Sequence, residues 1–202
     1  MIVQALKGTN ISPNLRKCFD VTMRSVISLL YCRREEDDIL KRMYRIIVSH
    51  RIWNYLSINQ KDLVREGSYL AEVTQHKRFK DYSFLVFPFA KSYEGYLKQL
   101  FLDVGYISHL DYISDHFRLG KYLSPHLIQR LENRSIYAQI RHNATEDMAK
   151  RIWEVWTKGR NQVFHYYPHN LRRIDFDEAF EINNQILRVM IESYEKLKEN
   201  NS

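Results

Sequence analysis

Glycine and proline are rare in this chain, whose 202 residues include six glycines and four prolines. Average proteins use these two residues at roughly 12% of their positions. Because glycine and proline form turns and interrupt helices, their scarcity predicts a chain built mainly of long helices. No segment carries a clear strand pattern, so the predicted fold class is all-α.

The charge of the chain favours an anionic partner. The formal net charge is +7, which points to nucleic acid first and to an acidic membrane or protein second. Cys18 and Cys32 are the only cysteines, too few for a disulfide framework or a thiolate metal site, as in a reducing cytosol. The first residues lack a signal-peptide pattern, and charges interrupt every apolar run before the roughly 20 residues that span a membrane. We therefore expect a cytoplasmic protein without a membrane segment.

The apolar spacing and the positions of candidate cap residues predict six main helices. These cover residues 12–32, 35–56, 59–79, 83–105, 145–167 and 177–199. Between the fourth and fifth, residues 106–135 are expected to mix loops with short helices. Charge is concentrated near residue 80, so we expect an additional N-terminal helical region over residues 1–80 and a second domain over residues 81–202.

The helix expected over residues 145–167 carries an arginine on its apolar face. At 100° per residue, Arg160 falls in line with the apolar stripe, which comprises Ala149, Ile152, Trp153, Trp156, Val163, Phe164 and Tyr167. A guanidinium stays charged, so a buried one must be paired or must face a polar cleft. On the helix expected over residues 83–105, Glu94 lies at the edge of the apolar stripe, with Lys91 one turn earlier on its flank. We therefore expect Glu94 and Arg160 to meet, either as a buried structural ion pair or at a functional site.

A histidine follows this arginine at a distance of five residues, and the spacing alone is a weak signal. Arg45 and His50 have the same spacing and serve as an internal comparison. Arg45 lies about 140° from the apolar row of its helix, where a solvated charge belongs, and no asparagine follows it. Arg160 differs in both respects. His165 is expected about 140° from Arg160, at a rim or an interface, if the helix continues.

The stretch "RNQVFH", residues 160–165, resembles the Arg-Asn-x-x-x-His motif of the HEPN superfamily (higher eukaryotes and prokaryotes nucleotide-binding). These are small helical domains, many of them metal-independent endoribonucleases. The upstream "KSYEGYLKQLF", residues 91–101, is similar to the helix paired with this motif in the RnlA/LsoA (RNase LS-type) toxins of toxin–antitoxin and anti-phage systems. The resemblance covers residues 82–202 and departs at Lys91, where we expect arginine. It implies a HEPN-like helical bundle, a homodimer whose motifs face each other across a groove, RNA as substrate and an antitoxin protein as partner.

Metal-independent RNA cleavage needs a base near the 2′-OH, an acid at the leaving 5′-oxygen and positive charge at the phosphate. A histidine can act as acid or base at neutral pH, and a forked guanidinium suits the phosphate oxygens. We therefore assign proton transfer to His165 and charge stabilisation to Arg160. Asn161 would hold a phosphate or orient the histidine, Glu94 would fix the arginine, and Lys91 would add positive charge. Contacts to the RNA backbone are expected from Lys158, Arg172, Arg173 and Arg141.

Other interpretations remain open. "RNQVFHYY" also satisfies the Arg-x-x-x-x-His-x-Tyr pattern of HEPN toxins neutralised by a partner nucleotidyltransferase, in which Tyr167 would be the modified residue. His165 and His169 have a metal-ligand spacing, but Pro168 lies between them and no third ligand is evident, so we expect neither a metal nor a cofactor. The chain could also be a catalytically silent HEPN-like domain that binds nucleic acid, a nucleotide or a scaffolded partner. A third possibility is a helical interaction protein.

Overall fold

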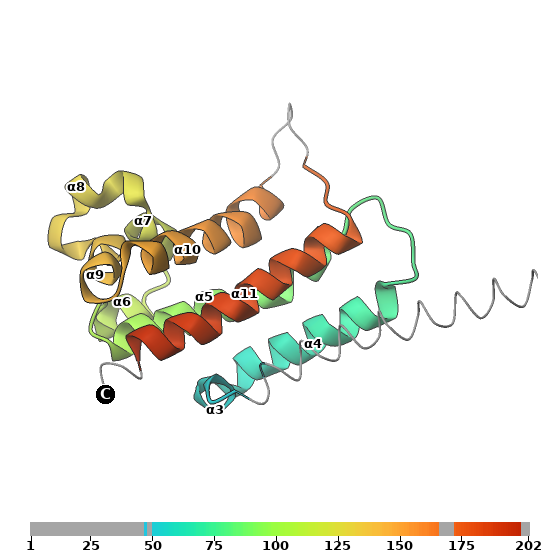
Figure 1. The fold of residues 1–202 in the computed structure, drawn as a ribbon, viewed down its shortest axis with the longest axis horizontal. Helices are drawn as coiled ribbons and strands as arrows, with labels where there is room; N and C mark the ends of the chain where they lie inside the picture. The colour runs from blue at the N-terminus through green and yellow to red at the C-terminus, as the bar shows by residue number, and fades with distance from the viewer. Residues whose placement is uncertain (1–46, 48–49, 166–171, 199–202) are drawn as a thin grey trace, which may run out of the picture. The chain divides into compact units, whose positions relative to one another are not determined.

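The structure, a computed structural model, describes residues 47, 50–165 and 172–198 (Figure 1). Contacts divide the chain into two units, residues 1–41 and 42–202, and all described residues belong to the second. Within these described residues every regular element is a helix and no strand occurs, so the all-α prediction is confirmed. No helix among them is both long and apolar enough to span a bilayer.

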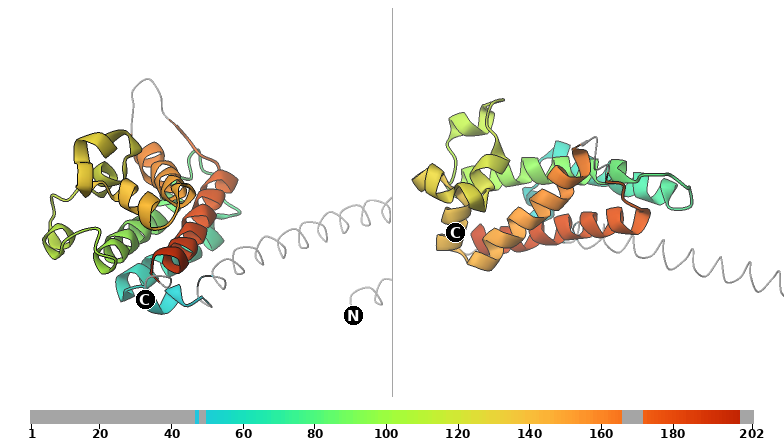
Figure 2. Two further views of the ribbon diagram at one scale, coloured as in Figure 1. Left: turned by 60° about the vertical axis from the view of Figure 1, so that its left-hand side comes forward. Right: turned by 90° about the horizontal axis from the view of Figure 1, so that it is seen from above.

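Four longer helices run alternately in opposite directions (Figures 1 and 2). In chain order they are α4 (Ile58–Thr74), α5 (Phe87–Asp103), α10 (Glu146–Trp156) and α11 (Phe176–Leu197). Shorter elements lie before and between them: α3 (Ile52–Tyr55), η2 (Ser83–Leu85), α6 (His109–Ile113), α7 (Leu119–Leu123), η3 (Pro125–Leu127), α8 (Ile128–Leu131), η4 (Glu132–Arg134) and α9 (Ile136–Asn143). The short pieces between α5 and α10 confirm the mixed segment expected there.

Side chains that cap helix ends fix where the long helices begin. The Ser57 hydroxyl accepts from the backbone N–H of Gln60 at the start of α4, in a reciprocal capping box. Thr145 and Asp175 cap α10 and α11 in the same position. Pro88 occupies the first turn of α5, where its missing N–H costs no helical hydrogen bond.

Helix α5 packs against α4 and α11, and its side chains are buried on more than one face. The Tyr96 hydroxyl bonds the backbone oxygen of Met190 at 2.9 Å, on α11. On the other side, the Ser92 hydroxyl donates to the backbone oxygen of Gln60 at 3.1 Å, on α4. Helices α4 and α5 approach closely at Gly67, where an added Cβ would lie 2.6 Å from Cε2 of Phe89. These contacts hold α5 in place, and α5 carries half of the candidate site.

One predicted helix is interrupted. The helix expected over residues 35–56 does not run through to its end, because His50 forms a bend and α3 begins only at Ile52. The His50 ring explains the break, since its Nδ1 accepts from the backbone N–H of Ile52 at 3.3 Å. Apart from Ile47, which is helical and buried, the earlier part of that helix lies outside the described residues, as does the helix expected over residues 12–32. The boundary at residue 80 stays a prediction; α4 and α5, on either side of it, pack together.

Candidate active site

The helix that carries "RNQVFH" changes its geometry inside the motif. Helix α10 is followed without a break by a π-helix, η5 (Thr157–Gln162), and a last turn that ends at Phe164. A π-helix bonds each residue to the fifth one along and has more residues in each turn, so positions after Trp156 fall behind a count of 100° per residue. Gly159 faces the core: it is buried, and an added Cβ would lie 3.1 Å from Cδ1 of Ile186 on α11.

The expectation that Arg160 and Phe164 lie in the buried stripe is wrong. The Arg160 side chain is 46% exposed, and Phe164 is 40% exposed. The physical reason is the direction of the buried face. At 100° per residue, the buried residues of α10, which are Met148, Ala149, Ile152, Val155 and Trp156, are centred roughly 80° from Arg160 and roughly 120° from Phe164. Val163, which was assigned to the same stripe, is buried as expected.

The predicted contact between Glu94 and Arg160 is present. Nε of Arg160 donates to Oε2 of Glu94 at 3.2 Å, and the Glu94 side chain is 30% exposed. An ion pair this accessible to water contributes only about 0–1 kcal/mol to folding. The pair is therefore not the buried structural salt bridge that was one of the two alternatives.

An open cavity of about 370 Å³ lies beside this ion pair. Its lining residues come from the first half of α5 and from the motif: Phe87, Ala90, Lys91, Glu94, Arg160, Phe164 and His165. The structure thus brings together four of the five predicted catalytic residues, two cations, one carboxylate and one imidazole. The fifth, Asn161, is half-buried and is not among the described residues that line the cavity.

His165 reaches the cavity because the helix ends earlier than expected. Helical structure was predicted to continue to Tyr167, which would have turned His165 well away from Arg160. Instead the last helical residue is Phe164, and His165 is the first residue after it. Leaving the helix lets the imidazole line the same cavity as the guanidinium.

Trp156 supports the guanidinium from the core side. Cζ of Arg160 lies 5.2 Å from the centroid of the Trp156 ring, a cation–π distance. The indole is buried, and its Nε1 has no hydrogen-bond partner among the described residues. Gly120 on α7 makes room for it, because a Cβ there would lie 2.8 Å from Nε1. The position of Arg160 therefore depends on α7 as well as on its own helix.

The four cations expected to bind RNA are not equally placed. Lys158 is exposed on η5 itself, and Arg173 is exposed just before α11. The Arg172 guanidinium donates to Gln162 on η5 and to Glu178 on α11.

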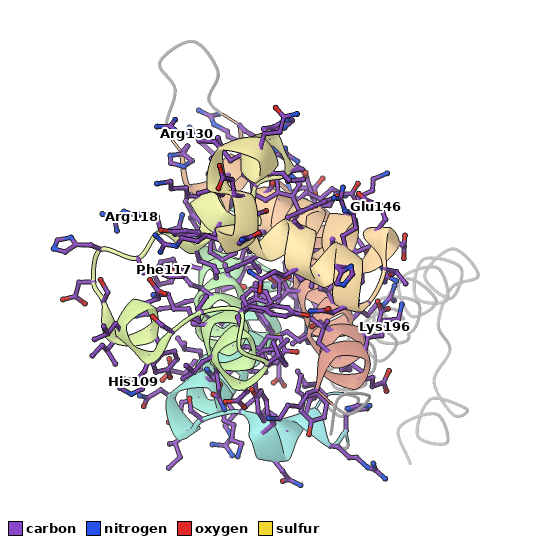
Figure 3. All side chains as sticks on the ribbon, turned by 90° about the vertical axis from the view of Figure 1, so that its left-hand side faces the viewer. His109, Phe117, Arg118, Arg130, Glu146 and Lys196 are labelled. Atoms are coloured by element: carbon purple, nitrogen blue, oxygen red, sulfur yellow. The ribbon has the colours of Figure 1, made fainter. Side chains whose placement is uncertain are left out.

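Arg141 lies at the far end of α10 from the cavity. Its Nε lies 3.6 Å from Oε2 of Glu146. Glu146, which is labelled in Figure 3, is the first residue of that helix. At 1.5 Å per residue, Glu146 is roughly 20 Å from Arg160 along the helix. The structure does not bring Arg141 to the cavity, and its role in binding RNA stays a prediction.

Sequence reasoning missed the aromatic side of the cavity. Phe87 was not singled out, and Phe164 was assigned to the core. A usable signal was present in "FPFAK", which places Phe87 one helical turn before Lys91. Tyr167 and His169 lie outside the described residues, and within the described part no group of three or more His, Cys, Asp or Glu side chains is arranged to hold a metal.

The chain matches no protein-family model, no curated protein and no solved structure. The interpretation of the cavity therefore depends on its own residues.

Proposed function

We propose that this protein is a metal-independent endoribonuclease with a HEPN-like helical bundle, acting as the toxin of a toxin–antitoxin or anti-phage defence system. The observation that carries the proposal is the cavity that gathers Lys91, Glu94, Arg160 and His165 from two separate helical segments. A surface ion pair alone needs no imidazole and no second cation beside it. RNA, whose backbone is anionic and contains its own nucleophile, fits this combination.

The reaction uses the 2′-hydroxyl of the substrate. The 2′-oxygen attacks the adjacent phosphorus, the bond from phosphorus to the 5′-oxygen breaks, and a proton moves from the 2′-oxygen to a base. A second proton is delivered to the leaving 5′-oxygen. The products are a 2′,3′-cyclic phosphate and a 5′-hydroxyl, and His165 supplies one of the two proton transfers.

Arg160 and Lys91 supply positive charge where the phosphate becomes more negative in the transition state. The ion pair with Glu94 fixes the direction of the guanidinium before the substrate arrives, which lowers the cost of orienting it. Asn161 is assigned to the phosphate or to the orientation of His165. Lys158 and Arg173, exposed around the motif and the start of α11, are assigned to neighbouring backbone phosphates.

The second proton transfer is assigned to a second copy of the chain. In a two-fold dimer the same surface meets itself, so one copy's His165 would approach the other's across a shared groove. An antitoxin protein that covers this groove is the proposed regulatory partner.

The test is cleavage of RNA by the purified protein in the presence of EDTA. We expect activity to persist and to give cyclic-phosphate and 5′-hydroxyl ends. His165→Ala should lower the rate by roughly 10²- to 10⁴-fold, and Arg160→Ala by roughly 10²- to 10³-fold. His142→Ala is the matched control, because this histidine is exposed on α9 and does not line the cavity.

Expression in a bacterial host provides a second test of the proposed activity. The wild-type protein should arrest growth, whereas a folded His165→Ala variant should not. Abolition of cleavage by EDTA, or equal toxicity of the two proteins, would contradict the proposal.

A further inference from the structure

Two phenylalanine rings stand exposed at the wall of the cavity. Phe87 is 52% exposed and Phe164 is 40% exposed, and both line the cavity. They come from different elements, the first residue of α5 and the last turn after η5. Their centroids lie 5.6 Å apart at an interplanar angle of 89°, a favourable edge-to-face arrangement. Apolar side chains that are exposed next to one another indicate an interaction site more often than single exposed apolar residues do.

The two rings are adjacent to the charges that would bind a phosphate. Nζ of Lys91 lies 5.9 Å from the centroid of the Phe87 ring. Phe164 directly precedes His165 in the chain. One wall of the cavity therefore offers flat apolar surface, and cationic groups lie within a side chain's length of it.

A nucleotide has the complementary structure, because one sugar joins its flat aromatic base to an anionic phosphate. Stacking of a base on an aromatic side chain is a common way to hold a nucleotide, and it tolerates any base because each has a π-face. In a duplex the faces of a base are covered by its neighbours in the strand. An aromatic wall beside a phosphate site can therefore be used only by an unpaired base.

We infer that Phe87 and Phe164 hold the unpaired base next to the phosphate that is cut, one ring stacking on its face and the other meeting its edge, and that the substrate of this cavity is single-stranded RNA. This inference rests on the ribonuclease activity proposed above. It adds the substrate class and two residues that determine it.

The first experiment combines a change in the protein with a change in the substrate, so that the two effects can be compared. The cleavage position in a single-stranded oligoribonucleotide is mapped from its product ends, and the base beside it is then replaced by an abasic site. Phe87→Ala and Phe164→Ala should each lower kcat/KM on the intact strand by roughly ten- to a hundred-fold. On the abasic strand the same variants should match the wild type.

Two further variants separate stacking from simple loss of structure. Phe87→Tyr and Phe164→Tyr keep a flat ring and should retain activity on the intact strand. Tyr69→Ala is the matched control, because Tyr69 is an exposed aromatic residue of α4 that does not line the cavity. Annealing the complementary strand should protect the wild-type substrate from cleavage.

Equal losses on the intact and abasic strands, or equal cleavage of single-stranded and duplex RNA, would overturn the inference without affecting the proposed ribonuclease activity. If the wild-type protein cuts no RNA, a 2′-deoxy oligonucleotide carrying 2-aminopurine at successive positions still tests the stacking. Its fluorescence should fall when the wild-type protein binds and should not fall with Phe87→Ala or Phe164→Ala. No change with the wild-type protein would refute the stacking as well.

Discussion

Arg160 is held by two side chains that leave part of its guanidinium available. Nε donates to Glu94, and the Trp156 ring lies at 5.2 Å. Within the described part of the chain no other hydrogen bond of this guanidinium is present, and its two terminal nitrogens carry several further N–H donors. Those terminal nitrogens are the groups that can form a forked contact to a phosphate. Glu94 is accordingly a positioning residue, which acts through the arginine.

The positioning role predicts that Glu94→Gln separates stability from activity. The pair is partly exposed, so the free energy of unfolding should change by less than about 1 kcal/mol. RNA cleavage should fall by roughly 10²-fold, because an Arg160 guanidinium that points in the wrong direction no longer matches the phosphate oxygens of the transition state. Urea unfolding and steady-state cleavage of the same preparations measure the two effects.

Asp62→Asn is the matched control for this variant, because Asp62 forms a similarly exposed pair with Arg65 at 2.9 Å on α4. It should alter neither quantity appreciably. A loss of the roughly 3–5 kcal/mol typical of a broken buried pair, with unchanged activity of the folded fraction, would instead make Glu94 a purely structural residue.

At the scale of elements, the long helices could be predicted from the sequence because cap residues, prolines and apolar spacing act within a single helix. Pro88 and Asp175 begin α5 and α11 near the expected positions. On α11, Ile186, Leu187 and Met190 are buried at helical spacing. The contact between Glu94 and Arg160 also followed from periodicity, because both residues were placed at the interior faces of their helices.

The π-helix could not be predicted in this way. Counting at 100° per residue assumes regular α-helical hydrogen bonds, and nothing in "TKGRNQ" alone says that the helix will widen. Phe164 was misplaced for another reason, because the buried face of α10 includes Met148 and Val155, which the predicted stripe left out. His165 was expected at a rim because the helix was continued past Phe164. Burial of Gly159 against Ile186 is a tertiary contact, and it is the kind of information that a single helix cannot supply.

If η5 places the motif, then removing one residue from it should abolish cleavage while keeping the fold. Deleting Lys158, which is exposed, should convert the wide turn into a regular α-helix and rotate the motif relative to α10. We expect the helical circular-dichroism signal and the melting temperature to be retained, and RNA cleavage to fall by roughly 10²-fold or more, as a displaced catalytic group costs.

Lys158→Ala is the control for this deletion, because it removes the same charge without changing the register. Lys158→Ala should lower the affinity for RNA and make that affinity less dependent on salt concentration. Its effect on the rate of the cleavage step should be much smaller. A deletion variant as active as Lys158→Ala would show that the π-helix has no part in placing the motif.

At the scale of the whole described unit, residues far apart in sequence tie the segment before α5 to the segment before α11. Oδ1 of Asp81 accepts from the backbone N–H of Ser83 at 3.0 Å and from that of Ile174 at 3.3 Å. In return, the Tyr82 N–H donates to the Ile174 oxygen at 2.9 Å. These bonds join the beginnings of α5 and α11, and α5 carries Phe87, Lys91 and Glu94.

This tie predicts a dependence of stability on pH. Partial burial alone would raise the pKa of Asp81, but the hydrogen bonds from Ser83 and Ile174 and the charge of Arg173 outweigh it and hold the pKa below its ordinary value of 3.8. A carboxyl with a lowered pKa in the folded state stabilises the fold above its unfolded pKa, and this stabilisation is lost as pH falls through the folded value.

Asp81→Asn should therefore lower the free energy of unfolding by about 1 kcal/mol at pH 7, and the difference from the wild type should shrink as the pH falls toward 3. Urea unfolding at pH 3, 4, 5 and 7 measures it. Ser83→Ala removes only the hydroxyl donor to the same oxygen, at 2.6 Å, and keeps the backbone N–H donor, so it should show a smaller loss with the same pH trend. A difference that stays constant from pH 7 to pH 3 would mean that the carboxylate charge does not fasten α5 to α11, and that the geometry of the cavity is set by core packing alone.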